Sequence, residues 1–406
     1  MKKILACLFA VSVISAAAFS KNFFSQRFFE IKIGAEADAS NNLITMNDIM
    51  KKDLVIDLKQ LADDCPQNGF NIREDAAPSI GWNLYVKDFH IGVKTGAQIY
   101  ENIEIGKDLF NFLGYGNSVG ESMNFKFTND TDVFYYTQLG VGFKIGRLKV
   151  NAEPALFIPL VSIRGGGGTI DVINDAEGNL KLGMNLNMDV YSAVPLKRQE
   201  DGNGVTMDGE LLQSTIMKGY GFDLGGGVTI PLPFFNALDL EATCRIPIIP
   251  GHLNYKSSVT GGFDYEMKLT DFENAKKTEK ETAVSSVEET IDVHRPLKFD
   301  VYLNKELLGG LFNARAGAGF GIRRPFCDAA VFYPKYYLGL GLNLIDMLKI
   351  GVSTQYTDQL FIHQVGATVN IRFIQLDVGV SAQSSSFTKS MAIAGAGAYA
   401  YVTIGF

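Results

Sequence analysis

The sequence predicts an all-β protein: a single transmembrane antiparallel β-barrel of about fourteen strands, with roughly twelve to sixteen compatible with the pattern. Apolar and polar residues alternate with a period of two, in segments of about ten residues that suit a tilted membrane-spanning strand. The polar positions are rich in glycine, which makes up 42 of the 406 residues. Tight turns alternate with long polar connections, as short periplasmic turns and longer extracellular loops do in outer-membrane barrels.

Eight segments carry the alternation. In Leu348–Tyr356, for example, Ile350 and Val352 alternate with Lys349. A soluble sandwich would turn the apolar set inward, whereas a membrane barrel turns it to lipid and the polar set to the lumen. The length of the segments favours the barrel, because soluble strands average about five or six residues. The other segments with this pattern are 89–98, 148–156, 238–246, 297–303, 312–322, 338–344 and 375–383.

Both ends of the chain fit an exported barrel. Residues 1–20 have the basic start and apolar stretch of a secretory signal peptide, with cleavage expected after Ser20 or after Ala18. Residues 21–406 would then form the barrel. The last strand is apolar on one face and ends at Phe406, which resembles the signal that hands barrels to their assembly machinery. We therefore expect that machinery and outer-membrane lipid as partners, and the bacterial outer membrane as the location.

Three segments between the alternating ones have other patterns. The segment 40–77 is expected to be a partly helical loop or plug, because the apolar residues of Leu54–Asp64 have helical spacing. Lys107–Leu113 also has the spacing of a short helix. Asp271–Arg295 is dense in Lys, Glu and Thr, so we expect a solvated loop there.

Several functions are excluded. The formal net charge is −7, whereas a nucleic-acid-binding domain needs a basic face, so no nucleic-acid partner is expected. Beyond the first 20 residues, no apolar run of about 18 residues predicts a helical membrane span. The glycine runs Gly165–Gly168 and Gly225–Gly227 lack the Lys-Ser/Thr of a phosphate-binding loop, and we interpret them as a flexible loop and a lumen-facing wall. No catalytic motif or metal-ligand spacing occurs, so we predict no enzyme activity, no cofactor and no metal site.

The predicted lumen face carries charges of both signs. One interpretation is a wall of ion pairs that closes and stiffens the barrel, because a charge inside must be hydrated or paired. A second is that Arg245, Arg315 and Arg323 bind the anionic headgroup of a ligand, since a guanidinium donates two hydrogen bonds to a carboxylate. A third is a plain aqueous pore. The charged residues assigned to this face are Lys149, Glu153, Asp239, Glu241, Arg245, Lys298, Asp300, Arg315, Arg323, Lys349 and Asp377.

Two stretches carry a family resemblance. Lys52–Leu58 and Lys107–Asn117, followed by an aromatic and glycine-rich hairpin at Tyr136–Val150, resemble an outer-membrane family of spirochaetes and Bacteroidetes that is known only as a domain of unknown function. That family is similar to the long-chain fatty-acid transporter barrels, which have about fourteen strands and an N-terminal plug. The present chain departs from the transporters, because Asn41–Leu43 is the nearest match to their Asn-Pro-Ala-like plug segment. No binding residue is therefore carried over.

The predicted function is passive uptake of a small solute, hydrophobic molecules included, across an outer membrane. Arg245, Arg315 and Arg323 are the candidate ligand contacts in the lumen. The alternative function is a non-conducting barrel that anchors surface loops for adhesion or assembly. A periplasmic soluble β-protein is a further alternative, and its outer face would be polar.

Overall fold

The structure is a computed structural model. Its described residues are almost entirely antiparallel β-structure, with few helices. Within them, no helix is both long and apolar enough to cross a membrane. The predicted signal peptide and part of the expected plug segment lie outside the described residues. The structure describes residues 27–46, 57–116, 120–174, 179–199, 204–207, 211, 218–232, 238–268, 271–345, 347–371 and 373–406.

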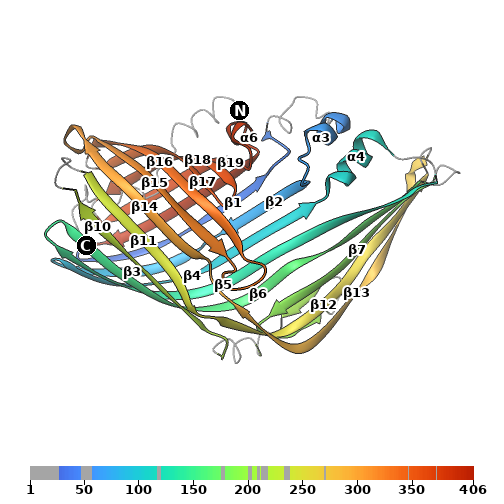
Figure 1. Cartoon of the computed structure of the whole chain (residues 1–406), viewed down its shortest axis with the longest axis horizontal. Helices are drawn as coiled ribbons and strands as arrows, with labels where there is room; N and C mark the ends of the chain where they lie inside the picture. Colours follow the sequence, from blue (N-terminus) through green and yellow to red (C-terminus); the bar gives the residue numbers. More distant parts are fainter. Residues whose placement is uncertain are drawn as a thin grey trace.

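The strands form a closed barrel of fourteen strands (Figure 1), which confirms the predicted fold class. The barrel closes where the first strand pairs with the last, from Glu30 opposite Gly405 to Ser40 opposite Gly395. β2 and β3 share one position, because both pair with β1 and β4 and are separated around Pro78. The positions in barrel order are β1 (Phe29–Asn41), β2 (Phe70–Ala76) with β3 (Ser79–Val86), β4 (Phe89–Ile105), β5 (Ser122–Ile145), β6 (Leu148–Asn174), β10 (Gly221–Pro231), β11 (Leu238–Ile249), β14 (Leu297–Leu307), β15 (Phe312–Arg323), β16 (Val331–Ile345), β17 (Leu348–Thr357), β18 (Leu360–Ile371), β19 (Ile374–Ser384) and β20 (Gly395–Gly405).

The apolar set faces outward, as the alternation predicts. Val352 is 49% exposed and Val380 is 42% exposed, whereas Lys349 is 9% exposed and Asp377 is fully buried in the interior. A soluble sandwich would show the reverse arrangement. Exposed apolar side chains extend around the barrel, among them Ile33, Ile80, Leu139, Val150, Leu224, Ile246, Leu303, Leu338, Leu340, Leu376 and Val402.

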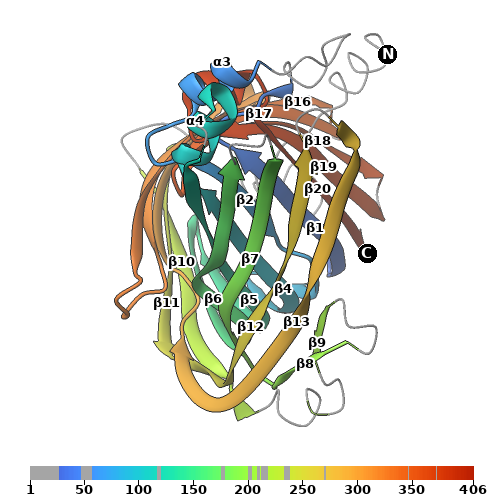
Figure 2. The same ribbon diagram turned by 90° about the vertical axis from the view of Figure 1, so that its right-hand side faces the viewer.

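One side of the wall continues beyond the barrel as a second sheet, here called the projecting sheet (Figures 1 and 2). β6 pairs with β10 over residues 149–157 and with β7 over residues 161–174. β11 likewise continues past Pro250 into β12, which pairs with β7 and β13. The projecting sheet therefore consists of the outer parts of β5 and β6 together with β7 (Asn179–Ser192), β12 (Gly251–Lys268) and β13 (Asp271–Val293).

The expected solvated loop at Asp271–Arg295 is wrong, because residues 271–293 form strand β13. This strand pairs along β12, for example with Tyr255 opposite Glu288. Its polar residues fall on both faces, so it lacks the alternation that marks a strand with one apolar face. Only part of one face is covered: Val284 packs on a small apolar cluster, while its neighbours Ala283 and Ser285 are exposed.

The glycine run Gly165–Gly168 is not in a flexible loop either. It lies within β6, at a bulge where pairing with β7 shifts between Ile163 and Gly167. A Cβ on Gly167 would lie 2.0 Å from the carbonyl oxygen of Phe127. Glycine is therefore needed here because the backbones of β5 and β6 approach too closely for a side chain. The run Gly225–Gly227 lies in barrel strand β10.

The two ends of the barrel differ as predicted. Short turns join β3 to β4 and β5 to β6 at the end where the chain finishes at Phe406. At the opposite end, longer connections carry the helices and a small apolar cluster of Ala62, Cys65 and Phe110. The helix predicted at Lys107–Leu113 is confirmed as α4. The helices at this end are α3 (Leu58–Asp64), α4 (Lys107–Tyr115) and α6 (Phe387–Met391), with α3 and α4 side by side in Figure 2.

Candidate functional site: a charged cavity in the barrel lumen

Inside the lumen, tyrosine rings lie over glycines of the neighbouring strands. A Cβ on Gly321 would lie 2.2 Å from the ring of Tyr333, and one on Gly379 would lie 2.2 Å from the ring of Tyr399. The inward-facing glycines therefore make room for aromatic rings, which line the space that remains.

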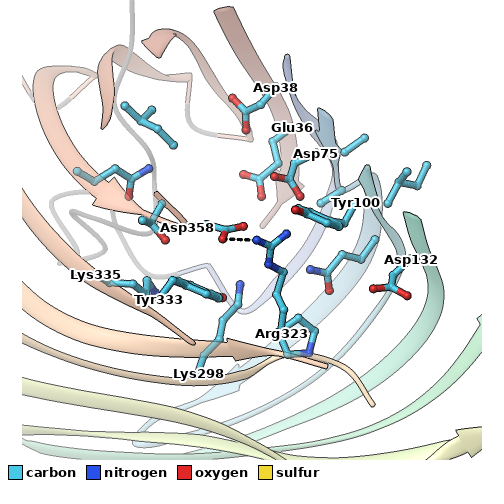
Figure 3. A pocket seen from close by; sticks show the side chains of 18 of the residues that line it. Glu36, Asp38, Asp75, Tyr100, Asp132, Lys298, Arg323, Tyr333, Lys335 and Asp358 are labelled. Atoms are coloured by element: carbon cyan, nitrogen blue, oxygen red, sulfur yellow. Dashed lines mark hydrogen bonds and ion pairs between the residues drawn. The ribbon is translucent and has the colours of Figure 1, made fainter. Parts of the chain in front are cut away.

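That remaining space includes a cavity of about 340 Å³ inside the barrel (Figure 3). Strands from opposite sides of the barrel line it, so it is a site of the lumen and not of a loop. Its charged and aromatic lining residues are Glu36, Asp38, Asp75, Tyr100, Asp132, Lys298, Arg323, Arg324, Tyr333, Lys335, Asp358 and Tyr399.

One wall of the cavity is acidic. Glu36 and Asp38 lie on β1, and Asp75 lies directly opposite Asp38 on β2. Asp38 accepts long hydrogen bonds from Ser381 (3.4 Å) and Gln383 (3.3 Å). In the part of the chain that the structure describes, none of the three carboxylates forms an ion pair. We call Glu36, Asp38 and Asp75 the acidic wall.

The facing wall is basic and mostly paired. The Arg323 guanidinium lies 2.7 Å from an Asp358 carboxylate oxygen and 4.0 Å from the centre of the Tyr100 ring. Lys335 lies 2.5 Å from Asp300. Lys298, from β14, forms no ion pair with any described residue. The cavity thus places an unpaired ammonium opposite three unpaired carboxylates.

Ion pairs join strands that are not neighbours in the sheet, at the end with the longer connections. Asp358, in the turn between β17 and β18, also pairs with Arg73 of β2 at 3.7 Å. Arg324, just after β15, donates to Asp132 (2.8 Å) and Asp130 (2.7 Å) of β5 and to the backbone oxygen of Ile163 (2.8 Å). These contacts tie facing parts of the wall together beside the cavity.

The three arginines predicted from the sequence all face the lumen, but the structure does not bring them to one place. Arg323 lines the cavity. Arg315 is paired with Glu241 at 3.2 Å and lies 3.8 Å from the centre of the Tyr302 ring. The Arg245 Nε donates to the backbone oxygen of Pro296 at 3.1 Å.

Sequence reasoning missed the acidic wall, although a signal for two of its three residues exists. Glu36 and Asp38 are two residues apart, so an extended strand places them on one face. The pairing of Asp38 with Asp75 depends on the register between β1 and β2. A connection of 28 residues, 42–69, separates the two strands, so the sequence does not fix that register. Arg324 and Asp358 lie in turns, where alternation gives no direction.

Comparison with known proteins identifies the architecture. No family model matches the sequence, and no curated protein matches it. Among solved structures, a deletion variant of the monoaromatic hydrocarbon channel TodX has a TM-score of 0.50 at 10% identity, covering 98% of this chain and 96% of that chain. The Ralstonia pickettii toluene transporter TbuX has a TM-score of 0.45 at 9% identity, covering 97% and 95%. At these identities the likeness shows the fold alone.

These two similar proteins are a monoaromatic hydrocarbon channel and a toluene transporter. The likeness confirms the barrel fold that the resemblance implies. The link to a family of spirochaetes and Bacteroidetes stays a prediction.

Proposed function

We propose that this chain is an outer-membrane barrel for passive uptake of a small solute. The observation that carries the proposal is a charged cavity inside a closed barrel whose outer face is apolar. A channel needs a polar interior that solutes can enter and an exterior that lipid can solvate. The likeness to a hydrocarbon channel supports a transport role at the level of the fold.

The proposal includes the location and the partners expected from the sequence. The apolar side chains on the outside of the barrel, such as Leu338 and Leu340, would contact lipid. The final strand, β20, would be recognised by the assembly machinery during insertion. Separation of outer and inner membranes on a density gradient tests the location, and recovery of the chain with the inner membrane would contradict it.

Two solute classes have support. The likeness to a monoaromatic hydrocarbon channel favours a hydrophobic solute. The lining of the cavity favours a polar one, because charged groups such as Asp75 and Lys298 lose hydration if an apolar molecule displaces their water. The lining belongs to this chain, so we give it the greater weight. Of the predicted ligand arginines, we propose Arg323 as the one that contacts solute.

The second candidate function is an anchor for a surface structure, and the projecting sheet favours it. An anchor needs no pathway, and ion pairs such as Arg73–Asp358 and Arg324–Asp132 would hold its lumen closed. The two functions differ in one property, which is whether any solute crosses.

Uptake into liposomes that contain the refolded chain separates the two functions. Arginine, glucose and benzenesulfonate are suitable probes, because they are similar in size and differ in charge. We expect at least one of them to enter faster than into protein-free liposomes, and Asp358→Ala to increase the rate by removing ion pairs that cross the lumen. If no probe crosses faster in either protein, the anchor is the better conclusion.

The anionic probe tests the arginine prediction separately. If an arginine of the lumen binds anionic headgroups, Arg323→Ala slows benzenesulfonate and leaves glucose unchanged. Arg245→Ala and Arg315→Ala serve as matched comparisons, because those arginines face the lumen outside the cavity. Equal slowing of both probes in all three variants would contradict a ligand role for Arg323.

A further inference from the structure

The acidic wall has an arrangement that costs stability. Asp38 and Asp75 are directly opposite on paired antiparallel strands, and like charges in that position repel. Glu36 lies two residues away on the same face of β1. By contrast, Glu241 and Asp300 each have a basic partner. Three neighbouring carboxylates without an ion pair provide a place for a cation that the chain itself does not supply.

The facing wall provides a complementary place for an anion. Arg323 and Lys335 already have carboxylate partners, but Lys298 has none among the described residues. Tyr333 lies beside it, only 4% exposed, and its hydroxyl has no hydrogen bond to any described residue although it lines the cavity. Figure 3 shows Asp75 and Lys298 entering the cavity from different sides. The two donors are thus free for an acceptor on a ligand.

We propose that this cavity binds a small dipolar solute, with a cationic group against the acidic wall and a carboxylate against Lys298 and Tyr333. Since three free carboxylates face one free ammonium, the cationic group is the more strongly selected, as in a basic amino acid or a short basic peptide. A volume of about 340 Å³ is at the small end of ligand sites.

This inference rests on the proposed function, and it names the class of solute that the barrel takes up. It also implies that the acidic wall contributes more to the binding affinity than Lys298 does. Replacing a carboxylate of the acidic wall removes the contact to the cation, and replacing Lys298 removes only the contact to the anion. Two probes that differ in the carboxylate therefore separate the two walls.

Calorimetric titration of the full chain in detergent tests the site, with arginine and agmatine as probes. Agmatine keeps the guanidinium and lacks the carboxylate. We expect arginine to bind more tightly than agmatine, and Asp38→Asn with Asp75→Asn to weaken both by about 10-fold or more, as the loss of charged hydrogen bonds implies. Lys298→Met should lower the affinity for arginine to that for agmatine, and the affinity for agmatine should not fall below its value in the parent.

The matched control is Glu153→Gln, which removes a lumen carboxylate outside the cavity that accepts a hydrogen bond from Gln138 at 2.8 Å. It should leave both affinities unchanged. Folding does not confuse the result, because the two Asn substitutions remove a repulsion and should not lower the melting temperature. Arginine that fails to bind the parent, equal weakening by Glu153→Gln, or a calcium ion that binds where arginine does not would each overturn the proposal.

The outcome is independent of the liposome assay. Uptake of glucose without binding of arginine would reject the dipolar site and leave the uptake function standing. Binding of arginine without uptake of any probe would reject the uptake function and leave the site.

Discussion

The barrel and the projecting sheet share strands β5 and β6 but follow different rules. In the barrel part of β6, outward residues such as Val150 and Leu156 are apolar and exposed. The hairpin of β12 and β13 instead carries ion pairs in water, such as Lys280 with Asp264 at 2.7 Å. The alternation of apolar and polar residues therefore depends on the solvent around a strand. A strand in lipid needs an apolar outer face, and a strand in water does not.

The two regions meet at a joint of mixed character. An apolar cluster that includes Phe134, Phe157 and Leu253 lies there, where β11 continues into β12. Beside it, Arg324 holds Asp130 and Asp132 on β5. The joint therefore combines apolar packing with charged hydrogen bonds. Substitutions can remove either kind of contact without the other.

The largest expected effect is at this joint. Arg324→Ala leaves the carboxylate of Asp132, which is 5% exposed, without its cation, and losing one partner of a buried pair costs about 3–5 kcal/mol. Arg198→Ala is the control, because Arg198 pairs with Glu281 at the surface of the projecting sheet, where a pair is worth about 0–1 kcal/mol. Urea titrations of the two variants in lipid give both free energies. Equal costs would show that the joint is no more than a surface contact.

The second effect tests the outer face of the barrel. Val352→Arg should cost about 2–4 kcal/mol if the residue lies near the middle of the bilayer. Val287 of β13, which is 54% exposed, is the counterpart in the projecting sheet, and Val287→Arg should change stability by no more than about 0.5 kcal/mol. Refolding titrations into lipid vesicles measure the difference. A barrel variant as stable as the β13 variant would place Val352 in water.

The third effect tests the glycine and tyrosine packing of the lumen. Gly379→Ala puts a Cβ 2.2 Å from the ring of Tyr399, so we expect a cost of about 1–3 kcal/mol. Gly140→Ala is the control, since the nearest atom to its Cβ would be 3.8 Å away. Combining Gly379→Ala with Tyr399→Ala should recover part of the cost in a double-mutant cycle. No coupling between the two sites would mean that the ring is free to move aside.

The smallest effect is a pH dependence in the projecting sheet. Asp189 accepts a hydrogen bond from Ser258 (2.7 Å) and pairs with Lys256 (3.0 Å), and these contacts lower the pKa of its carboxyl below the usual value. A lowered pKa in the folded state gives stability above the unfolded pKa that is lost as pH falls through the folded pKa. The exposed pair is screened, so Asp189→Asn should cost at most about 1 kcal/mol at pH 7. Urea titrations at pH 7 and near pH 3 should show the cost disappearing in acid, and an equal cost at both values would contradict it.

Prediction from sequence succeeded where lipid constrains the residues. All eight alternating segments lie in barrel strands, and Lys349 and Asp377 face inward as expected. It failed for Asp271–Val293, because polar residues occupy both faces of β13 and leave no alternation of apolar and polar positions. Among the cavity residues, the inward orientation of Arg323 could be predicted from the alternation along β15. The pairing of Asp38 with Asp75 does not, because it depends on the register between two strands and not on either strand alone.

A pathway for solute through the lumen is tested most directly by filling the cavity covalently and measuring uptake. In a chain whose other cysteines are replaced, Ser381→Cys places a thiol at the cavity, and Ser285→Cys places one on β13. A bulky methanethiosulfonate reagent should stop arginine uptake into liposomes for the Ser381→Cys variant and leave the Ser285→Cys variant unchanged. Uptake that continues after complete labelling at residue 381 would contradict a pathway through the cavity.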